Sequence, residues 1–362
     1  MGDRLVAGAV TVRADAITAV DLDERDDSGP IIAPGFVDVH VHGWGGHDAM
    51  GGPDALAGMA RALARRGVTS FLPTAVSAPL ADLGRFVATA RAWRSGGGSP
   101  GGAEPLGVNL EGPFLADERR GAHDARALIA PEDVTALDLE PLTDGLRLIT
   151  IAPESPGALG LIEALRARGV AVSLGHSAAT LGESRAGYAA GATGTTHLFN
   201  AMSGLDHRAP GLAAAALLDD DVFVELIADG QHVHPALWSL IRRAKGADRL
   251  VLVSDAIALA GMGDGRSTLG GLDVEVADGR ATLAGTTTLA GSVIALDDAV
   301  RRLVGTGTPI PEAIAAATVN PLALIGQTDR GRLAVGQRAD LVELDDGLHV
   351  RAVWIGGRRL DA

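Results

Sequence analysis

Two histidines separated by one residue lie near the start of the chain, in the segment PGFVDVHVHGWGG that covers residues 34–46. If this segment is a β-strand, His40 and His42 point to the same face and their rings converge on one point. Two convergent imidazoles are typical of a metal site. An isolated pair is explained equally well by one core histidine and one loop histidine. The rest of the chain must therefore decide between the two interpretations.

The elements that would position these histidines form a repeating pattern. Short apolar runs cover residues 36–41, 68–73, 106–110, 146–151, 170–174, 194–197, 222–227 and 250–253. Segments of helical character lie between them, at residues 54–66, 80–94, 158–168, 180–190 and 235–245. Eight strands that alternate with helices predict a parallel, closed (β/α)8 barrel, which is an α/β fold.

Potential ligands and acid–base groups follow most of these runs. They are His40, His42, Glu111, His176, His197, Asp229, His232 and Asp255. Barrel active sites lie at the carboxyl ends of the strands, where residues from distant parts of the sequence meet. One polar residue after a strand can occur by chance. A whole set of them at the carboxyl end of the same barrel is difficult to explain by structural roles alone. The sequence therefore predicts an active site there.

Composition and charge exclude several classes of protein. The chain has 362 residues, of which 47% are hydrophobic, so it can bury a large core. It has no cysteine, so we expect a cytoplasmic protein whose metal ligands are histidine and carboxylate. A net charge of -14 without a basic stretch argues against nucleic acid or an anionic membrane as partner. We expect neither a signal peptide nor a membrane-spanning segment, because no apolar run is long enough.

Seven motifs occur in order over almost the whole chain. They are PGFVDVHVHG (34–43), NLEGPF (109–114), SLGHS (173–177), THLFNAM (196–202), ADGQHVHP (228–235), VSDA (253–256) and LAGS (289–292). Together they resemble the N-acetylglucosamine-6-phosphate deacetylases of the amidohydrolase superfamily. The two histidines and the aspartate of VSDA are shared across that superfamily. LEGPF, THLFNAM and the DGxHV pattern point to the deacetylase branch.

The resemblance implies a small β-sandwich beside the TIM barrel, formed by the two termini. We expect residues 1–33 and 330–362 in the sandwich and residues 34–329 in the barrel. Few residues precede Pro34, so the first strand or two of the sandwich are expected to be shortened or missing. Residues 268–283, with the turn Asp278-Gly279, predict an inserted hairpin. The glycine-rich segment 95–102 is interpreted as a linker, since it lacks the lysine of a phosphate-binding loop.

One or two divalent ions are implied, with zinc the best candidate and ferrous iron an alternative. The first site would contain Glu111, His176 and His197. The second would contain His40, His42 and Asp255, with Glu111 shared. A bridging carboxylated lysine is excluded because the only lysine, Lys245, lies late in a helical segment. A glutamate can bridge two ions in its place, since it has two oxygens.

The chemistry expected of such a site is amide hydrolysis. Asp255 would take a proton from the attacking water and pass it to the leaving amine, and His232 would stabilise the developing oxyanion. His234 is interpreted as a surface residue at a helix start.

The resemblance places the substrate against His232 and a second group of residues. That group is His123, Asn200, Ala201 and Arg208. Arg208 would bind the phosphate through its guanidinium. Arg119 and Arg120 either assist it or are ordinary surface charges, and the sequence leaves both possibilities open.

The sequence thus predicts hydrolysis of N-acetylglucosamine 6-phosphate to glucosamine 6-phosphate and acetate by a homodimer whose partner subunit could complete the phosphate site. One alternative is an amidohydrolase for another N-acyl sugar, such as N-acetylgalactosamine 6-phosphate. Another is a binding protein without activity on the same barrel, because a fold does not impose a function.

Overall fold

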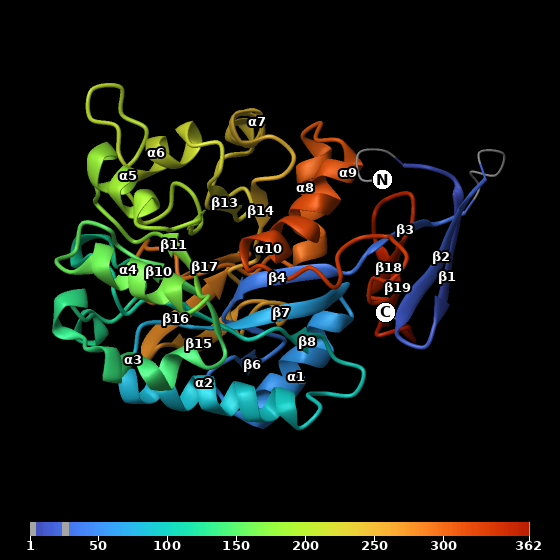
Figure 1. Cartoon of the computed structure of the whole chain (residues 1–362), viewed down its shortest axis with the longest axis horizontal. Coiled ribbons are helices and arrows are strands. Elements are labelled where there is room, and N and C mark those ends of the chain that lie inside the picture. Colours follow the sequence, from blue (N-terminus) through green and yellow to red (C-terminus); the bar gives the residue numbers. More distant parts are fainter. Residues whose placement is uncertain (1–4, 24–28, 362) are drawn as a thin grey trace.

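The computed structural model describes residues 5–23 and 29–361, and its centre is a barrel of eight parallel strands (Figure 1). The barrel strands are β4 (Phe36–Val41), β7 (Val68–Ala75), β9 (Val108–Glu111), β10 (Leu146–Ile151), β11 (Ala171–Leu174), β12 (Gly194–Thr195), β13 (Phe223–Leu226) and β14 (Leu250–Leu252). Each strand coincides with or overlaps one of the eight apolar runs. These runs are apolar because parallel strands are buried on both faces. The predicted (β/α)8 barrel is confirmed.

Hydrogen bonds join the barrel strands in the order β14-β13-β12-β11-β10-β9-β7-β4. The seam between β4 and β14 is joined just beyond the strand ends, where the Asp255 backbone N–H donates to the His40 carbonyl and the His42 N–H donates to the Ala256 carbonyl, both at 2.8 Å. A short strand, β8 (Glu104–Pro105), adds to β7. The first and last barrel strands therefore meet at the predicted metal ligands.

Helices surround the barrel (Figure 1). They are α1 (Pro53–Ala64), α2 (Leu80–Ser95), α3 (Ala136–Thr143), α4 (Ala158–Ala167), α5 (Leu181–Ala189), α6 (Leu212–Leu218), α7 (Pro235–Lys245), α8 (Leu296–Gly305), α9 (Ile310–Ala316) and α10 (Val319–Leu324). Their sequences explain their placement. In α8, for example, Leu296, Val300 and Leu303 recur at helical spacing and are buried, while Arg302 follows in the last turn, where a cation is favourable.

The chain ends form a smaller antiparallel structure beside the barrel (Figure 1). One sheet has the order β20-β19-β18-β3, with β3 (Ile31–Pro34), β18 (Leu341–Leu344), β19 (Val350–Ile355) and β20 (Arg358–Asp361). A hairpin of β1 (Gly8–Arg13) and β2 (Ala16–Leu22) packs on it, with Ile17 buried against Ala339 and Leu341. Three strands, β1, β2 and β3, thus precede the barrel, while the expectation that this part is shortened relative to the family stays a prediction.

A buried arginine connects the two parts of the molecule. Arg330 donates to the Ser70 hydroxyl of β7 at 3.0 Å, to Glu104 of β8 at 3.0 Å and to Asp340, just before β18, at 3.2 Å. The side chain of Arg330 is only 5% exposed. Arg338 also pairs with Asp340, at 3.1 Å. This network ties the base of the barrel to the small sheet.

A three-stranded sheet covers one side of the barrel mouth. It consists of β15 (Gly265–Leu269), β16 (Leu272–Ala277) and β17 (Arg280–Leu283). Asp278 and Gly279 both have positive φ, 52° and 72°, as a tight hairpin turn requires, so the predicted turn is correct. Leu269 and Val274 pack with Val76 of the barrel loops. Two short strands, β5 (Gly43–Trp44) and β6 (His47–Asp48), pair after β4. Among the described residues, no helix is both long enough and apolar enough to cross a membrane.

Candidate active site

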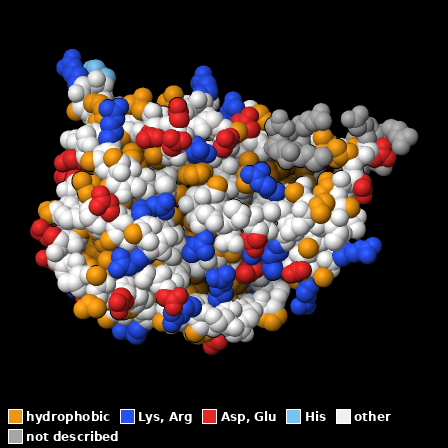
Figure 2. All heavy atoms as spheres, in the orientation of Figure 1, with side chains coloured by type: hydrophobic (Ala, Val, Ile, Leu, Met, Phe, Trp, Pro, Cys, Tyr) orange, Lys and Arg blue, Asp and Glu red, His pale blue; other side chains and the backbone are white. Residues whose placement is uncertain are grey.

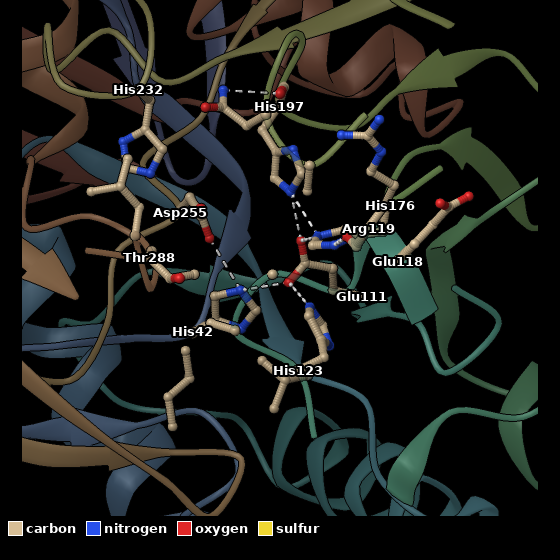
Figure 3. Close-up of a pocket in the computed structure, with 18 residues that line it drawn as sticks. His42, Glu111, Glu118, Arg119, His123, His176, His197, His232, Asp255 and Thr288 are labelled. Atoms are coloured by element: carbon tan, nitrogen blue, oxygen red, sulfur yellow. Dashed lines mark hydrogen bonds and ion pairs between the residues drawn. The ribbon is translucent and has the colours of Figure 1, made fainter. Parts of the chain in front are cut away.

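A cavity of about 360 Å³ opens at the carboxyl ends of the barrel strands (Figure 3). Most of the residues singled out in the sequence line it, namely His42, Glu111, His123, His176, His197, Asn200, Ala201, His232 and Asp255. Leu269 of β15 and the segment 288–291 close another side. His40 is fully buried and contacts the same groups from within the barrel. With Val76, which follows β7 and also lines the cavity, the structure brings together residues from seven of the eight strands or the loops that follow them.

Glu111, the last residue of β9, is at the centre of this group (Figure 3). Its Oε1 lies 2.9 Å from His176 Nε2 and 2.8 Å from His197 Nε2, and these two nitrogens are 3.0 Å apart. Its Oε2 lies 3.3 Å from His42 Nε2. One carboxylate therefore faces both predicted groups of ligands.

His40 and His42 present their Nε2 atoms to the same place, as alternation along β4 requires. Their ring centroids are 5.2 Å apart. Asp255 Oδ1 lies 3.1 Å from His42 Nε2 and 3.6 Å from His40 Nε2. Glu111 Oε1 lies 3.5 Å from His40 Nε2. The four side chains expected to form the second site therefore lie close together.

Hydrogen bonds on the far side of the rings determine which nitrogen faces the cavity. His42 Nδ1 donates to the Thr74 carbonyl at 3.2 Å, and His176 Nδ1 donates to the Arg119 carbonyl at 2.8 Å. In a neutral imidazole the other nitrogen, Nε2, then carries a lone pair. Both rings are consequently held in the tautomer that binds a metal.

His123 is held in the opposite tautomer. Its Nδ1 accepts from the Ser77 backbone N–H at 3.1 Å, so in the neutral ring Nε2 carries the proton and donates to Glu111 Oε2 at 3.1 Å. Burial lowers the pKa of His123 to about 4, which keeps the ring neutral. His123 meets Glu111 and His176 closely enough to complete a metal triad, but its Nε2–H makes it a hydrogen-bond donor rather than a ligand.

The two central carboxylates are ionised despite their burial. Burial by itself raises the pKa of Glu111, but the neighbouring His40, His123 and His176 lower it well below the usual range. Burial also raises the pKa of Asp255, but the hydrogen bond from His42 when that ring is protonated at both nitrogens, together with the charge of a protonated His40, outweighs burial and leaves the pKa below its usual value. Both groups are therefore available to bind a cation or accept a proton at neutral pH.

The backbone is unusual where several site residues follow their strands. His176, His197 and Asp255 have left-handed φ angles of 47°, 27° and 51°. Such conformations cost about 1–3 kcal/mol each in residues other than glycine and occur preferentially at active sites. Gly291 permits a close approach here, since a Cβ on it would lie 2.7 Å from the Asp255 carbonyl oxygen. The geometry of the ligands is thus set by a backbone that the barrel holds under strain.

His232 lines the wall of the cavity that lies across from Glu111 (Figure 3). Its Nδ1 donates to Asp229 Oδ2 at 2.7 Å, and Asp229 Oδ1 accepts the backbone N–H of His232 at 2.9 Å. Burial lowers the pKa of His232, but Asp229 more than compensates, so the net shift is upward. His234 has a different role, as expected, because its Nδ1 accepts from the Ala236 N–H and caps α7.

The residues expected at the phosphate are less closely grouped. Asn200 and Ala201 line the cavity, whereas Arg208 lies on an exposed loop and is not among the lining residues. Arg119 lines the cavity and is the only arginine or lysine of the described residues that does so. Arg120 instead pairs with Asp117 at 2.7 Å. The structure thus separates the two neighbouring arginines that the sequence could not distinguish.

The arrangement fits divalent metal ions. His40, His42 and Glu111 present three ligand atoms within 4.8 Å of one another. His40 Nε2 is buried and has no hydrogen-bond partner in the described part of the chain, which is costly for a polar atom unless a ligand satisfies it. The donors are imidazole nitrogens and carboxylate oxygens, a set that suits zinc or ferrous iron.

The sequence and structure are similar to those of known proteins. Residues 31–360 match the amidohydrolase family model. The chain is 43% identical to the N-acetylgalactosamine-6-phosphate deacetylase of Escherichia coli O157:H7, over 94% of this chain and 89% of that protein. It is 42% identical to the human N-acetylglucosamine-6-phosphate deacetylase, over 92% of this chain and 84% of that protein.

Two solved structures have nearly the same fold. The Thermotoga maritima N-acetylglucosamine-6-phosphate deacetylase has a TM-score of 0.91 at 35% identity, covering 98% of this chain and 95% of that one. A mutant of the Mycobacterium smegmatis enzyme in complex with N-acetyl-D-glucosamine-6-phosphate has a TM-score of 0.90 at 37% identity, with the same coverage of both chains.

Proposed function

The chain belongs to the amidohydrolase family, and on that basis we propose that it hydrolyses the N-acetyl group of N-acetylglucosamine 6-phosphate to give glucosamine 6-phosphate and acetate. The observation that carries this proposal is the convergence of four histidines and two carboxylates on one cavity. An amide is a poor electrophile with a poor leaving group, so its hydrolysis needs an activated water and a proton donor. The cavity contains groups suited to both tasks.

Two cations would be held by the residues around Glu111. Glu111, His176 and His197 would hold the first, and His40, His42 and Asp255 would hold the second with Glu111 shared between them. Zinc is the cation proposed, with ferrous iron as the alternative. When bound, such a cation lowers the pKa of water and polarises a carbonyl group.

Asp255 is proposed to move the proton. It is 6% exposed, so bulk water does not compete for it, and its lowered pKa makes it a base at neutral pH. It accepts the proton as water attacks the acetyl carbonyl and returns it to the nitrogen as the tetrahedral intermediate collapses. The amine then leaves as a neutral group.

His232 is proposed to stabilise the oxyanion of that intermediate. Since Nδ1–H is engaged by Asp229, the ring must be protonated to present a second N–H from Nε2. The raised pKa of His232 favours this imidazolium form. A donor of this kind contributes about 3–4 kcal/mol to transition-state stabilisation.

The sugar and phosphate are proposed to bind against the remaining wall. His123, whose Nε2–H is donated to Glu111, would lie against the substrate together with Asn200 and Ala201, which line the same cavity. Arg208, which does not line the cavity of its own chain, would bind the phosphate in the site of a partner subunit in a homodimer. Arg119 would add a cation from the same chain. A cytoplasmic location remains a prediction.

The experiment that tests this function is acetate release from a panel of sugars. The expected order is N-acetylglucosamine 6-phosphate first and unphosphorylated N-acetylglucosamine far behind. N-Acetylgalactosamine 6-phosphate is the second candidate substrate, because the E. coli relative that is 43% identical bears that name. Faster turnover of N-acetylgalactosamine 6-phosphate would show that this sugar is the substrate instead. Equal turnover of the unphosphorylated sugar would show that the cavity has no phosphate-binding site.

A further inference from the structure

Glu225 is a buried carboxylate to which neither the sequence motifs nor the proposed reaction assigns a role. It lies in the middle of β13, in the sequence FVEL, and is 1% exposed. A carboxylate without a compensating partner is very costly at such a position. A barrel strand with alanine or valine there would lack this cost. The residue therefore requires an explanation in terms of what it contacts.

Its contacts lead to both groups of metal-binding residues. Glu225 Oε2 lies 3.0 Å from His40 Nδ1 and accepts the backbone N–H of His197 at 3.2 Å. Glu225 Oε1 has no hydrogen-bond partner among residues 5–23 and 29–361. A single oxygen thus connects a proposed ligand of one cation to the backbone of a proposed ligand of the other. His197 is also one of the residues with a left-handed φ, which this hydrogen bond helps to hold.

The contact with His40 fixes a tautomer. Glu225 Oε2 already accepts the His197 N–H, so it acts as an acceptor and His40 Nδ1 carries the proton of that hydrogen bond. In the neutral ring Nε2 then carries the lone pair, which faces Glu111 and Asp255. Carboxylate partners of this kind orient metal-binding histidines and increase their basicity. His42 and His176 use backbone carbonyls instead. His40 is the one proposed ligand among the described residues whose far nitrogen bonds to a side chain.

We propose that Glu225 is a positioning residue that sets the metal-binding tautomer of His40 and thereby the affinity of the site formed with His42 and Asp255. This inference rests on the proposed function, since it presumes that cations bind there. Glu225 does not touch the substrate and transfers no proton. Its role is to keep His40 Nε2 unprotonated and correctly aimed.

The test uses the whole protein, stripped of metal and titrated with Zn²⁺ against a chromophoric chelator. The wild type is expected to bind two equivalents. Glu225→Gln keeps the size but removes the charge, and its amide can donate to His40 Nδ1 and reverse the tautomer. We expect one of the two affinities to fall by about 10–100-fold, with the other nearly unchanged. The control is Asp340→Asn, which neutralises another buried carboxylate but should leave both affinities as they are.

Each outcome bears on a different claim. A wild-type protein that binds no Zn²⁺ would overturn the proposed function together with this inference. A wild type with two sites and an equally tight Glu225→Gln variant would overturn the inference alone, as would an equal loss in Asp340→Asn. If Glu225→Gln does not fold, the nitrogen-15 NMR spectrum of the Zn²⁺-loaded wild type shows which nitrogen of the His40 ring carries the proton. A proton on His40 Nδ1 supports the proposal, and a proton on Nε2 refutes it.

Discussion

Replacing Arg330 by methionine should destabilise the protein without altering the cavity. The guanidinium is buried between β7, β8 and the small sheet, and it contacts three carboxylates and one hydroxyl, on Glu104, Asp329, Asp340 and Ser70. Removing one partner from a buried ion pair costs about 3–5 kcal/mol, because the remaining charge is left uncompensated. Here Arg338 still pairs with Asp340 at 3.1 Å. The lower end of that range, about 3 kcal/mol, is therefore expected.

This loss corresponds to a measurable change in melting temperature. The entropy of unfolding is about 2.1 cal/mol/K per residue, and the chain has 362 residues. A loss of about 3 kcal/mol then lowers Tm by about 4 °C. Thermal unfolding followed by circular dichroism, at one fixed protein and zinc concentration, would measure it.

The control is Arg242→Met. Arg242 pairs with Glu312 at 2.9 Å between α7 and α9, but both side chains are about 30% exposed, so the loss should be below about 1 kcal/mol. Equal Tm values for the Arg330 and Arg242 variants would refute the argument that burial makes the difference. So would an Arg330→Met protein as stable as wild type.

Three further predictions concern the cavity. Asp255→Asn should lower kcat by about 10²–10⁴-fold while the variant still binds zinc, and acetate release together with metal analysis would check both points. Asp229→Asn removes the group that raises the pKa of His232, so the ring should lose its proton at lower pH. The alkaline limb of the pH profile of kcat should therefore shift to lower pH, and an unchanged limb would argue against a role for the imidazolium form. Arg208→Ala should raise KM for the phosphorylated sugar at least tenfold and leave turnover of the unphosphorylated sugar as it is, whereas equal effects on both sugars would exclude a phosphate contact.

Much of the fold follows from regularities that are visible in the sequence. The barrel was predictable because its strands are buried on both faces and alternate with helices. His40 and His42 were predictable as a pair because side chains two apart on β4 share a face. Glu111 and Asp255 could be located because each comes at or just beyond a strand end, where a barrel places its active site.

Other features depend on contacts that no local pattern reveals. Glu225 is embedded in an apolar run, and only the fold shows that it meets His40 from a strand 185 residues away. A charged residue in a strand predicted to be buried was the available signal. Arg119 and Arg120 are adjacent in sequence, and the short helical turn Asp117–Arg119 places one at the cavity and the other on Asp117. The tautomer of His123 likewise depends on Ser77, which is 46 residues away.

The surface of the molecule bears on the partners that the sequence excluded. Figure 2 shows Lys and Arg side chains interspersed with Asp and Glu side chains over the face drawn there, with no continuous basic area. A nucleic acid or an anionic membrane would need such an area to neutralise its phosphates.

The most direct test of the central claim is acetate release from N-acetylglucosamine 6-phosphate before and after metal removal. The protein would be treated with a chelator, dialysed, and assayed as zinc is returned in known amounts. Activity is expected to disappear with the metal and to return with no more than two equivalents of zinc. Full activity in protein shown by elemental analysis to be free of metal would contradict the central claim.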